Sequence, residues 1–215
     1  MIQTDDCLIH VVDDDAAFRR SLVFLFESVG WRVRPHASAE DFLAECDAAA
    51  GGGECADIAC LVLDIRMPTM SGLELQQAIL ARGWTLPIVF ITGHGDVGLA
   101  VQAMKCGASD FLEKPFHDQA LLDAVTMAIR RGTEARAELA RREDAAAALA
   151  RLSPREREVA RLVAQGLPNK RVARALGISE KTVHVHRQHV MEKAGVASAA
   201  ELARLMLRAD PAALD

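Results

Sequence analysis

Short apolar runs alternate with amphipathic stretches through the first 131 residues. The apolar runs bounded by turn residues are Leu8–Val12, Cys60–Leu63, Ile88–Thr92 and Ser109–Leu112, and Arg32–His36 is a weaker strand candidate. Between the first two, apolar residues recur at helical spacing from Phe18 to Val29, and Gly30 follows where a helix would end. Strands that alternate with helices form βαβ units, so this pattern predicts an α/β, doubly wound domain with a parallel sheet of five strands.

Helix signals fill the other intervals between these strands. They predict helices that begin after Ser38, span about Gly72 to Arg82, follow Asp96 and start near Asp118, with a flexible glycine loop at 51–53. Residues 132–150 are mostly Ala, Arg and Glu, with Leu139 and Leu149 as the only large apolar side chains. We expect this segment to be a partly helical linker. The alternative is a continuation of the preceding helix into a dimeric coiled coil, but no sustained heptad supports it.

From residue 151 onward the pattern becomes entirely helical. The residues suited to begin helices are Ser153, Asn169, Ser179 and Ser198, and those suited to end them are Gly166 and Gly177. Pro154 and Glu156 complete a capping box behind Ser153. The third helix is expected over about 180–193 and the fourth over about 198–207. Four short helices with a tight turn between the second and third predict an all-α helix-turn-helix domain over 151–215.

Charge divides the chain at the same place. Residues 151–215 carry 12 Lys or Arg and 7 Asp or Glu, a net charge of +5, whereas residues 1–150 carry 13 and 23, a net charge of −10. The two domains therefore have different partners. No apolar run approaches the ~18 residues of a membrane span, and the N-terminus has no basic region leading into an apolar one. We expect a cytoplasmic protein without a membrane partner.

The cysteines do not form a recognisable framework. Their positions are Cys7, Cys46, Cys55, Cys60 and Cys106. An odd number without a C-x-x-C pair argues against a disulfide framework and against structural zinc.

Polar side chains follow the predicted strands at four places. Asp13, Asp14 and Asp15 follow the first strand directly, Asp64 ends the third, Thr92 ends the fourth and Lys114 comes just after the fifth. Because the carboxyl ends of parallel strands share one edge, these groups should converge there. Clustered carboxylates need a cation among them, and hard oxygen ligands select Mg²⁺ or Mn²⁺. A nucleophile, a cation and a donor pair are the parts for phosphoryl transfer to a carboxylate. The simpler interpretation of Asp13, Asp14 and Asp15 is a solvent-exposed acidic turn.

These segments resemble the receiver domains of two-component response regulators. The matching segments are Val11–Asp15, Asp64–Pro68 with Ser71-Gly72, Ile91–Gly95 and Phe111–Phe116, within a resemblance that covers residues 8–130. The resemblance implies that Asp64 is the phosphoacceptor. It also implies that Asp13, Asp14, Asp64 and the backbone carbonyl of Arg66 hold Mg²⁺.

The same resemblance implies a switch. Lys114 would pair with the phosphoryl group, Thr92 would move to hydrogen-bond it, and Phe111 would turn inward. Phosphorylation adds about −1.5 to −2 charges beside these donors, and the glycine-rich segment 93–98 can change conformation at low cost. His94 is a candidate contact to the phosphoryl group or to hydrolytic water, and its alternative is a solvent-facing loop histidine.

The third helix of the second domain carries polar residues that suit a nucleic acid. In a helix-turn-helix the second helix of the motif enters the major groove, although the same residues would suit any exposed helix face. The polar residues of this helix, together with the segments Leu152–Val159 and Leu176–Val183, resemble the LuxR-type helix-turn-helix over about 151–208. The resemblance places His184, Val185 and Gln188 toward bases and Lys181, Thr182, His186 and Arg187 toward the DNA backbone, while Asn169 and Lys170 would add phosphate contacts. Gln188 could pair with adenine and Val185 could pack on a thymine methyl.

A receiver joined to this domain is similar to the NarL/FixJ class of response regulators. The resemblance implies a phosphorylation-activated transcription regulator and not an enzyme. Its partners would be a sensor histidine kinase, promoter DNA, a second copy bound through the fourth helix and fifth strand of the receiver, and RNA polymerase as a further candidate. The acidic receiver would cover the basic helix until phosphorylation frees it.

Two other functions use the same residues. The carboxylates could serve a Mg²⁺-dependent phosphatase with an aspartyl nucleophile, but such enzymes place a second Asp two positions later, where this chain has Arg66. A redox-responsive regulator independent of phosphorylation could use Cys60 and Cys106, for which small apolar packing is the alternative.

Overall fold

The computed structural model describes residues 7–49, 58–93 and 97–214. The chain divides into two compact units, residues 1–134 and 135–215, which are described separately. The predicted glycine loop at 51–53 and His94 lie outside the described residues. None of the helices in the described part of the chain is both long enough and apolar enough to cross a membrane.

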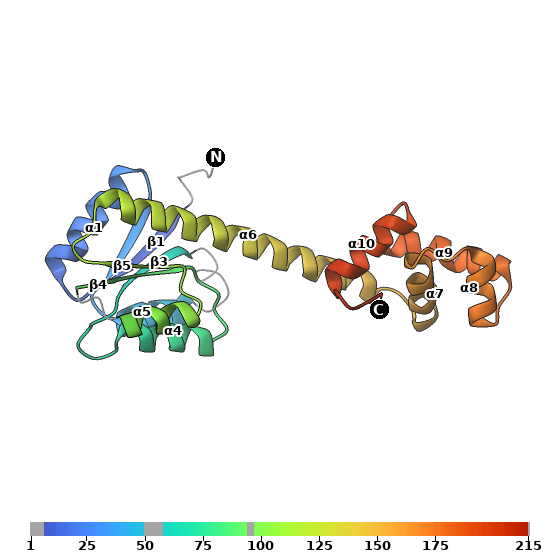
Figure 1. The fold of residues 1–215 in the computed structure, drawn as a ribbon, viewed down its shortest axis with the longest axis horizontal. Coiled ribbons are helices and arrows are strands. Elements are labelled where there is room, and N and C mark those ends of the chain that lie inside the picture. Colours follow the sequence, from blue (N-terminus) through green and yellow to red (C-terminus); the bar gives the residue numbers. More distant parts are fainter. Residues whose placement is uncertain (1–6, 50–57, 94–96, 215) are drawn as a thin grey trace. The chain divides into compact units, whose positions relative to one another are not determined.

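The first unit is built on a parallel sheet of five strands (Figure 1). Its strands are β1 (Leu8–Val12), β2 (Arg32–His36), β3 (Ile58–Asp64), β4 (Ile88–Thr92) and β5 (Asp110–Glu113), in the order β2-β1-β3-β4-β5. Every residue of β4 is buried, which explains why an uninterrupted apolar run encodes it. This order is that of flavodoxin-like folds, in which ligands bind where the strand order reverses, here between β1 and β3.

Helices cover both faces of the sheet. They are α1 (Ala16–Ser28), α2 (Ala39–Ala49), α4 (Gly72–Ala81), α5 (Val97–Lys105) and α6 (Asp118–Ala150). Apolar residues of α1 and the start of α6 pack around Ile9, Val11 and Val62 on one face. Those of α2, α4 and α5 pack around Leu61, Leu63 and Phe90 on the other, as the opposite placement of α6 and α4 in Figure 1 shows. The predicted fold class is confirmed for this unit.

Helix α6 is longer than the sequence pattern suggested. It is continuous from Asp118 to Ala150, so residues 132–150 are helical throughout and not partly helical. The helix therefore continues through residues 132–150, as the alternative interpretation of this segment expected. Alanine, arginine and glutamate have high helix propensity, which extends a helix without a second apolar face. A Cβ at Gly132 would lie 2.4 Å from Pro87 Cγ, so α6 passes close to the sheet at that point. The domain boundaries stay a prediction.

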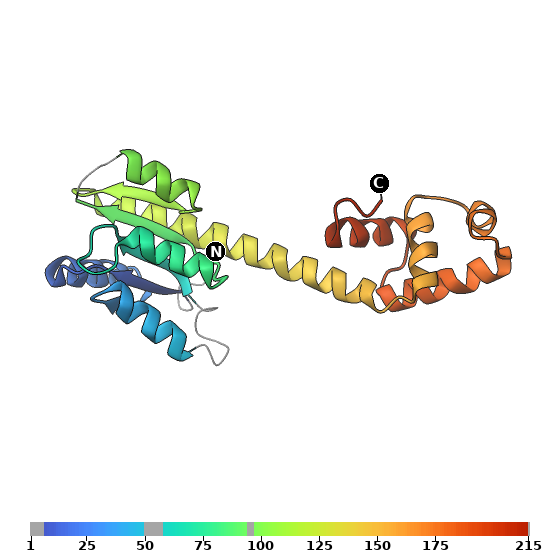
Figure 2. The ribbon, with the colours of Figure 1, turned by 90° about the horizontal axis from the view of Figure 1, so that it is seen from below.

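The second unit consists of short helices around one core, orange to red in Figure 2. After the end of α6, these are α7 (Pro154–Ala164), α8 (Asn169–Leu176), α9 (Glu180–Ala194) and α10 (Ala199–Ala209). Ser153, Ser179 and Ser198 cap three of them as expected, and Gly177 ends α8 in the left-handed conformation at φ +66°. Asn169 does not cap α8, contrary to the prediction. Pro168 precedes the helix, and Asn169 accepts a hydrogen bond from Arg187 instead.

Candidate functional site

The carboxyl edge of the sheet brings together the four polar positions expected there. Val12 lies beside Leu63, and Asp13 and Asp64 each come one residue later. Asp64 pairs with Ile91 on β4, which places Thr92 one step beyond. The backbone N–H of Lys114 donates to the carbonyl of Thr92 at 2.7 Å. Four different strand ends therefore supply one site at the point where the strand order reverses.

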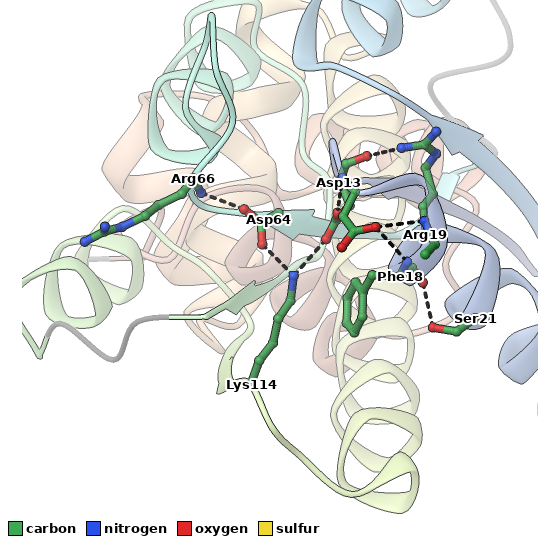
Figure 3. Close-up of polar contacts among 9 residues, drawn as sticks. Asp13, Phe18, Arg19, Ser21, Asp64, Arg66 and Lys114 are labelled. Atoms are coloured by element: carbon green, nitrogen blue, oxygen red, sulfur yellow. Dashed lines mark hydrogen bonds and ion pairs between the residues drawn. The ribbon is translucent and has the colours of Figure 1, made fainter.

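Lys114 bridges the two buried carboxylates (Figure 3). Its Nζ lies 2.9 Å from Asp13 Oδ2 and 2.8 Å from Asp64 Oδ1, and the two Asp residues are only 1% and 6% exposed. The second oxygen of each carboxylate is held by the backbone. Asp13 Oδ1 accepts from Asp15 N at 2.8 Å, and Asp64 Oδ2 accepts from Arg66 N at 2.7 Å. Each carboxylate is thus fixed at one oxygen and turned toward the ammonium at the other.

The charges of this site affect one another. Burial raises the pKa of Asp13, and the hydrogen bond and charge of Lys114 oppose that rise. Burial also disfavours the charge on Lys114, but the hydrogen bonds and charges of Asp64 and Asp13 outweigh it and raise the pKa of the ammonium. Lys114 therefore stays charged at neutral pH and stabilises the ionised form of Asp13.

Asp15 has a different role from its two neighbours. Its Oδ1 accepts hydrogen bonds from Phe18 N at 3.1 Å and Ala17 N at 2.8 Å, so it is the N-cap of α1. These bonds, with that of Phe18 first, lower the pKa of Asp15. Asp14 lies exposed between the cap and the buried Asp13. Of the acidic triplet, one carboxylate is buried, one faces solvent and one starts a helix.

The first turn of α1 contributes two contacts that the sequence analysis missed. The Arg19 guanidinium donates to the backbone carbonyl of Asp13 at 2.5 Å, and Lys114 Nζ lies 3.8 Å from the centroid of the Phe18 ring. Both residues follow the cap Asp15 within one helical turn. A search for side chains three and four positions after that cap would have found them.

The donor set fits a hard divalent cation. In the described part of the chain no group of three or more His, Cys, Asp or Glu is gathered as a metal cluster. However, Asp13 and Asp64 aim one oxygen each at a single positive charge, and Asp14 adds an exposed carboxylate beside them. Carboxylate and carbonyl oxygens are the ligands that Mg²⁺ prefers. The residues present therefore fit Mg²⁺ or Mn²⁺ at this edge of the sheet.

The start of α4 lies directly against the strand that carries Asp64. Gly72 N donates to the carbonyl of Ile65 at 2.9 Å, and a Cβ on Gly72 would lie 2.3 Å from the Asp64 carbonyl oxygen. Only glycine fits that approach. Ser71 and Glu74 form a capping box that fixes the helix in this place.

Helix α5 is anchored at its C-terminal end. The buried Gln76 of α4 donates through Nε2 to the carbonyls of Ala103 and Cys106, both at 3.2 Å. Thr92 is fully buried at the end of β4, and Phe111 is partly buried against the core on the α4 face. Of the residues expected to act as a switch, Thr92 thus comes before α5 and Phe111 packs on the face of the sheet that α5 covers. The C-terminal end of α5 itself is fixed by Gln76.

Two histidines are buried behind Asp13. His10 Nδ1 and His36 Nε2 share a hydrogen bond of 2.8 Å, and their rings are stacked with centroids 5.0 Å apart. Burial, and then the charge of His36, lowers the pKa of His10 to about 4. Burial also lowers the pKa of His36, whose backbone carbonyl accepts from Asp13 N at 3.4 Å. The pair is neutral at neutral pH.

Helix α9 presents most of its predicted DNA contacts to solvent. Lys181, Thr182, His184, Val185 and Gln188 are exposed, and His186 and Arg187 are partly buried. Lys170 is exposed at the start of α8, whereas Asn169 Oδ1 accepts from Arg187 Nη1 at 3.2 Å. Asn169 and Arg187, both predicted to contact the DNA backbone, are therefore hydrogen-bonded to each other between α8 and α9.

A buried ion pair fixes α9 against α7. Glu156 is 3% exposed, and its two carboxylate oxygens lie 2.8 and 2.7 Å from Lys193 Nζ. The hydrogen bond from Lys193, and then that from the backbone of Ser153, lowers the pKa of Glu156 to about 2. Arg155 links α7 to α8 instead, since its Nη2 donates to the carbonyl of Leu176 at 2.6 Å.

Known protein families match both units. The description "Response regulator receiver domain" matches residues 9–126, and "Bacterial regulatory proteins, luxR family" matches residues 150–206. The transcriptional regulatory protein FixJ of Azorhizobium caulinodans is 47% identical over 207 residues, which are 96% of this chain and 95% of that protein. The C4-dicarboxylate transport transcriptional regulatory protein DctR of Rhodobacter capsulatus is 46% identical over 199 residues, or 92% and 98% of the two chains.

Solved structures agree with these matches. The response regulator StyR has a TM-score of 0.80 at 42% identity, over 93% of this chain and 98% of that chain. Full-length FixJ from B. japonicum has a TM-score of 0.59 at 45% identity, over 96% and 98%. A flavodoxin-like sheet with this acidic edge, followed by a helix-turn-helix, defines a receiver joined to a DNA-binding domain. The chain belongs to the response regulators of two-component systems, in the FixJ/NarL class, and is a transcription regulator and not an enzyme.

Proposed function

We propose that Asp64 accepts a phosphoryl group and that its phosphorylation activates promoter binding by the second unit. An oxygen of the Asp64 carboxylate attacks phosphorus, and the bond from phosphorus to the donor breaks with its electron pair. The donor is the phosphohistidine of a sensor kinase, which leaves as neutral imidazole after it takes up a proton, or a small acyl phosphate, which leaves as a carboxylate. The bridge that Lys114 makes between Asp13 and Asp64 carries this proposal.

Each residue of the edge has a task in this reaction. Lys114 holds a positive charge where negative charge develops on the phosphoryl oxygens, and the buried Thr92 supplies a hydroxyl at the neighbouring strand end. Asp13, Asp14, Asp64 and the carbonyl of Arg66 would hold Mg²⁺ or Mn²⁺, which supplies further charge neutralisation when bound. His94 is a candidate second donor to the phosphoryl group.

Phosphorylation would then move the start of α5. The added charge of about −1.5 to −2 attracts the donors of Thr92 and Lys114, and Phe111 turns inward as the segment ahead of α5 shifts. Helix α5 exposes Val97, Val101 and Met104, which are 78%, 47% and 46% accessible and spaced along one side. We propose that this stripe, with β5, pairs with a second copy.

The second unit would bind the paired half-sites of a promoter in the cytoplasm. His184, Val185 and Gln188 face bases and Lys170, Lys181, Thr182, His186 and Arg187 face the DNA backbone, and Asn169 takes part through Arg187. RNA polymerase is a further candidate partner of the promoter-bound dimer. The buried Cys60 does not favour a redox function, because burial raises the pKa of its thiol well above the usual range.

The proposal is tested by footprinting a promoter with the purified full chain, with and without acetyl phosphate and Mg²⁺. Wild-type protein should protect two half-sites more strongly after phosphorylation, and Asp64→Asn should show only the unphosphorylated level. Full phosphate-dependent protection by Asp64→Asn would refute the assignment. High salt should weaken both DNA binding and any masking of the basic helix by the receiver.

A further inference from the structure

The Phe18 ring lies against the charged end of Lys114. The Lys114 Nζ stands over the ring, 3.8 Å from its centroid, while the same atom is bonded to Asp13 and Asp64. An aromatic face attracts a cation because its quadrupole is negative above and below the ring. The ammonium is therefore held from three sides, by two carboxylates and one ring.

The position of the ring is fixed by its surroundings. The backbone N–H of Phe18 is bound to the cap residue Asp15, in the same loop that carries Asp13. The ring also meets Phe116 edge to face, with centroids 6.1 Å apart and planes at 74°. Phe116 lies two residues after Lys114, so α1 and the segment that carries the lysine are joined by an aromatic pair as well as by the cation.

We infer that Phe18 is a positioning residue for Lys114, in addition to its packing role. This inference rests on the proposed phosphorylation of Asp64. An ammonium has three N–H donors, of which Asp13 and Asp64 take two. The ring attracts the positive charge as a whole and not one N–H bond. The ammonium can therefore turn an N–H toward a phosphoryl oxygen and still keep its attraction to the ring.

Other side chains at this position would act differently. A carboxylate would hold the ammonium more strongly but would compete with the phosphoryl group for its N–H donors. Leucine would fill the space but would leave the ammonium free to follow either carboxylate. The aromatic ring keeps the cation in place and leaves its hydrogen bonds available for transfer.

The experiment varies the quadrupole of the ring at nearly constant size. Phe18 is replaced in the full chain by phenylalanines with one, two, three and five fluorines, and by Leu, Tyr and Trp. A cavity of about 390 Å³, which Phe18, Lys114 and Phe116 help to line, leaves room for the indole. The initial rate of Asp64 phosphorylation is measured by intact mass at increasing acetyl phosphate.

We expect the maximal rate to fall stepwise with each fluorine and to fall about threefold to thirtyfold in Phe18→Leu. Tyr and Trp should keep the rate, and the acetyl phosphate concentration at half-maximal rate should stay the same, because Lys114 acts on the charge that develops during transfer. Phe24→Leu is the matched control, since Phe24 lies on the same helix, is 77% exposed and should leave the rate unchanged.

A second measurement needs neither metal nor donor. In Mg²⁺-free protein the side-chain CH₂ next to the Lys114 nitrogen should show an upfield ring-current shift by NMR, which Phe18→Leu removes and Phe24→Leu keeps. The inference is overturned if the pentafluoro variant reacts like wild type, or if Phe18→Leu leaves that resonance in place. If wild type takes up no phosphoryl group, the proposed function fails instead, and the resonance alone decides the role of Phe18.

Discussion

The ion pair between Glu156 and Lys193 allows a quantitative test of what holds α9 against α7. Glu156→Gln keeps the shape of the side chain but removes its charge, so the two charge-assisted hydrogen bonds of 2.7 and 2.8 Å are reduced to one bond from Lys193 to the remaining amide oxygen. Breaking a fully buried pair costs about 3–5 kcal/mol. Lys193 is 42% exposed and can be rehydrated, so we expect a smaller loss of about 1.5–3 kcal/mol, typical of hydrogen bonds to charged groups.

Amide hydrogen exchange of the full chain measures this loss locally. At pH 7, peptides from α7 and α9 should exchange about 10- to 150-fold faster in Glu156→Gln, while peptides from the sheet of the first unit stay unchanged. Glu158→Gln is the matched control, because its exposed pair with Arg155 should contribute less than about 1 kcal/mol. Equal exchange in Glu156→Gln and wild type would show that the pair does not hold α9.

The same pair sets a dependence on pH. The pKa of Glu156 is lowered from 4.5 to about 2, so the folded state binds this proton less readily than the unfolded state does. Its stabilisation is complete above about pH 4.5 and is lost as the pH falls toward 2. Glu156→Gln should remove that part of the acid sensitivity of α7 and α9. A variant as acid-sensitive as wild type would contradict the assignment.

Four further predictions concern the other contacts. Gly72→Ala should lower the free energy of unfolding by about 1–3 kcal/mol in urea titrations followed by tryptophan fluorescence, because a Cβ would meet backbone at 2.3 Å. Gln76→Leu should cost about 1–3 kcal/mol and speed exchange at the end of α5, whereas Gln77→Leu on the exposed side of the same helix should not. Stability of the first unit should decline as the pH falls from about 6.5 toward 4, because the pKa of His10 is lowered to about 4 and the unfolded state takes the proton first, and His10→Phe should flatten this decline. Lys181→Ala should reduce the slope of log affinity for DNA against log salt by about 0.9.

Each of these has an outcome that would count against it. Wild-type urea midpoints for Gly72→Ala would mean that α4 can shift at no cost, and equal exchange in both glutamine variants would mean that Gln76 does not anchor α5. A pH profile unchanged by His10→Phe would assign the acid sensitivity to other groups. An unchanged salt slope in Lys181→Ala would place that lysine away from phosphate.

Much of this architecture could be predicted from the sequence because each element has a strong local signal. The apolar runs give β1 and β4 with their observed bounds, since these strands are buried and short, and the weaker candidate Arg32–His36 gives β2, of which only His36 is buried. The polar residues at the strand ends then follow from the geometry of any parallel sheet. That topology predicts that Asp13, Asp64 and Lys114 meet at one edge of the sheet, but it does not predict that Lys114 bridges the two carboxylates.

The rest depends on contacts that a pattern does not encode. An acidic residue after a strand can be a metal ligand or a helix cap, and only the start of α1 shows that Asp15 is a cap. Asn169 has the residue type of a cap, but its partner Arg187 comes from the next helix, 18 residues away. The absence of a heptad in residues 132–150 argues against a coiled-coil partner but does not bear on helix propensity, so it is compatible with the continuous helix observed.

The lysine bridge at the edge of the sheet also bears on how the protein depends on its ionic surroundings. Because Lys114 sets one positive charge against the two buried carboxylates of Asp13 and Asp64, the acidic edge contains part of its own counter-charge. This pairing lowers the free-energy cost of burying two like charges side by side in the first unit. If Asp64 accepts a phosphoryl group as proposed, a change in free Mg²⁺ would act on that chemistry, while the bond network of Lys114 would still hold the two carboxylates in place.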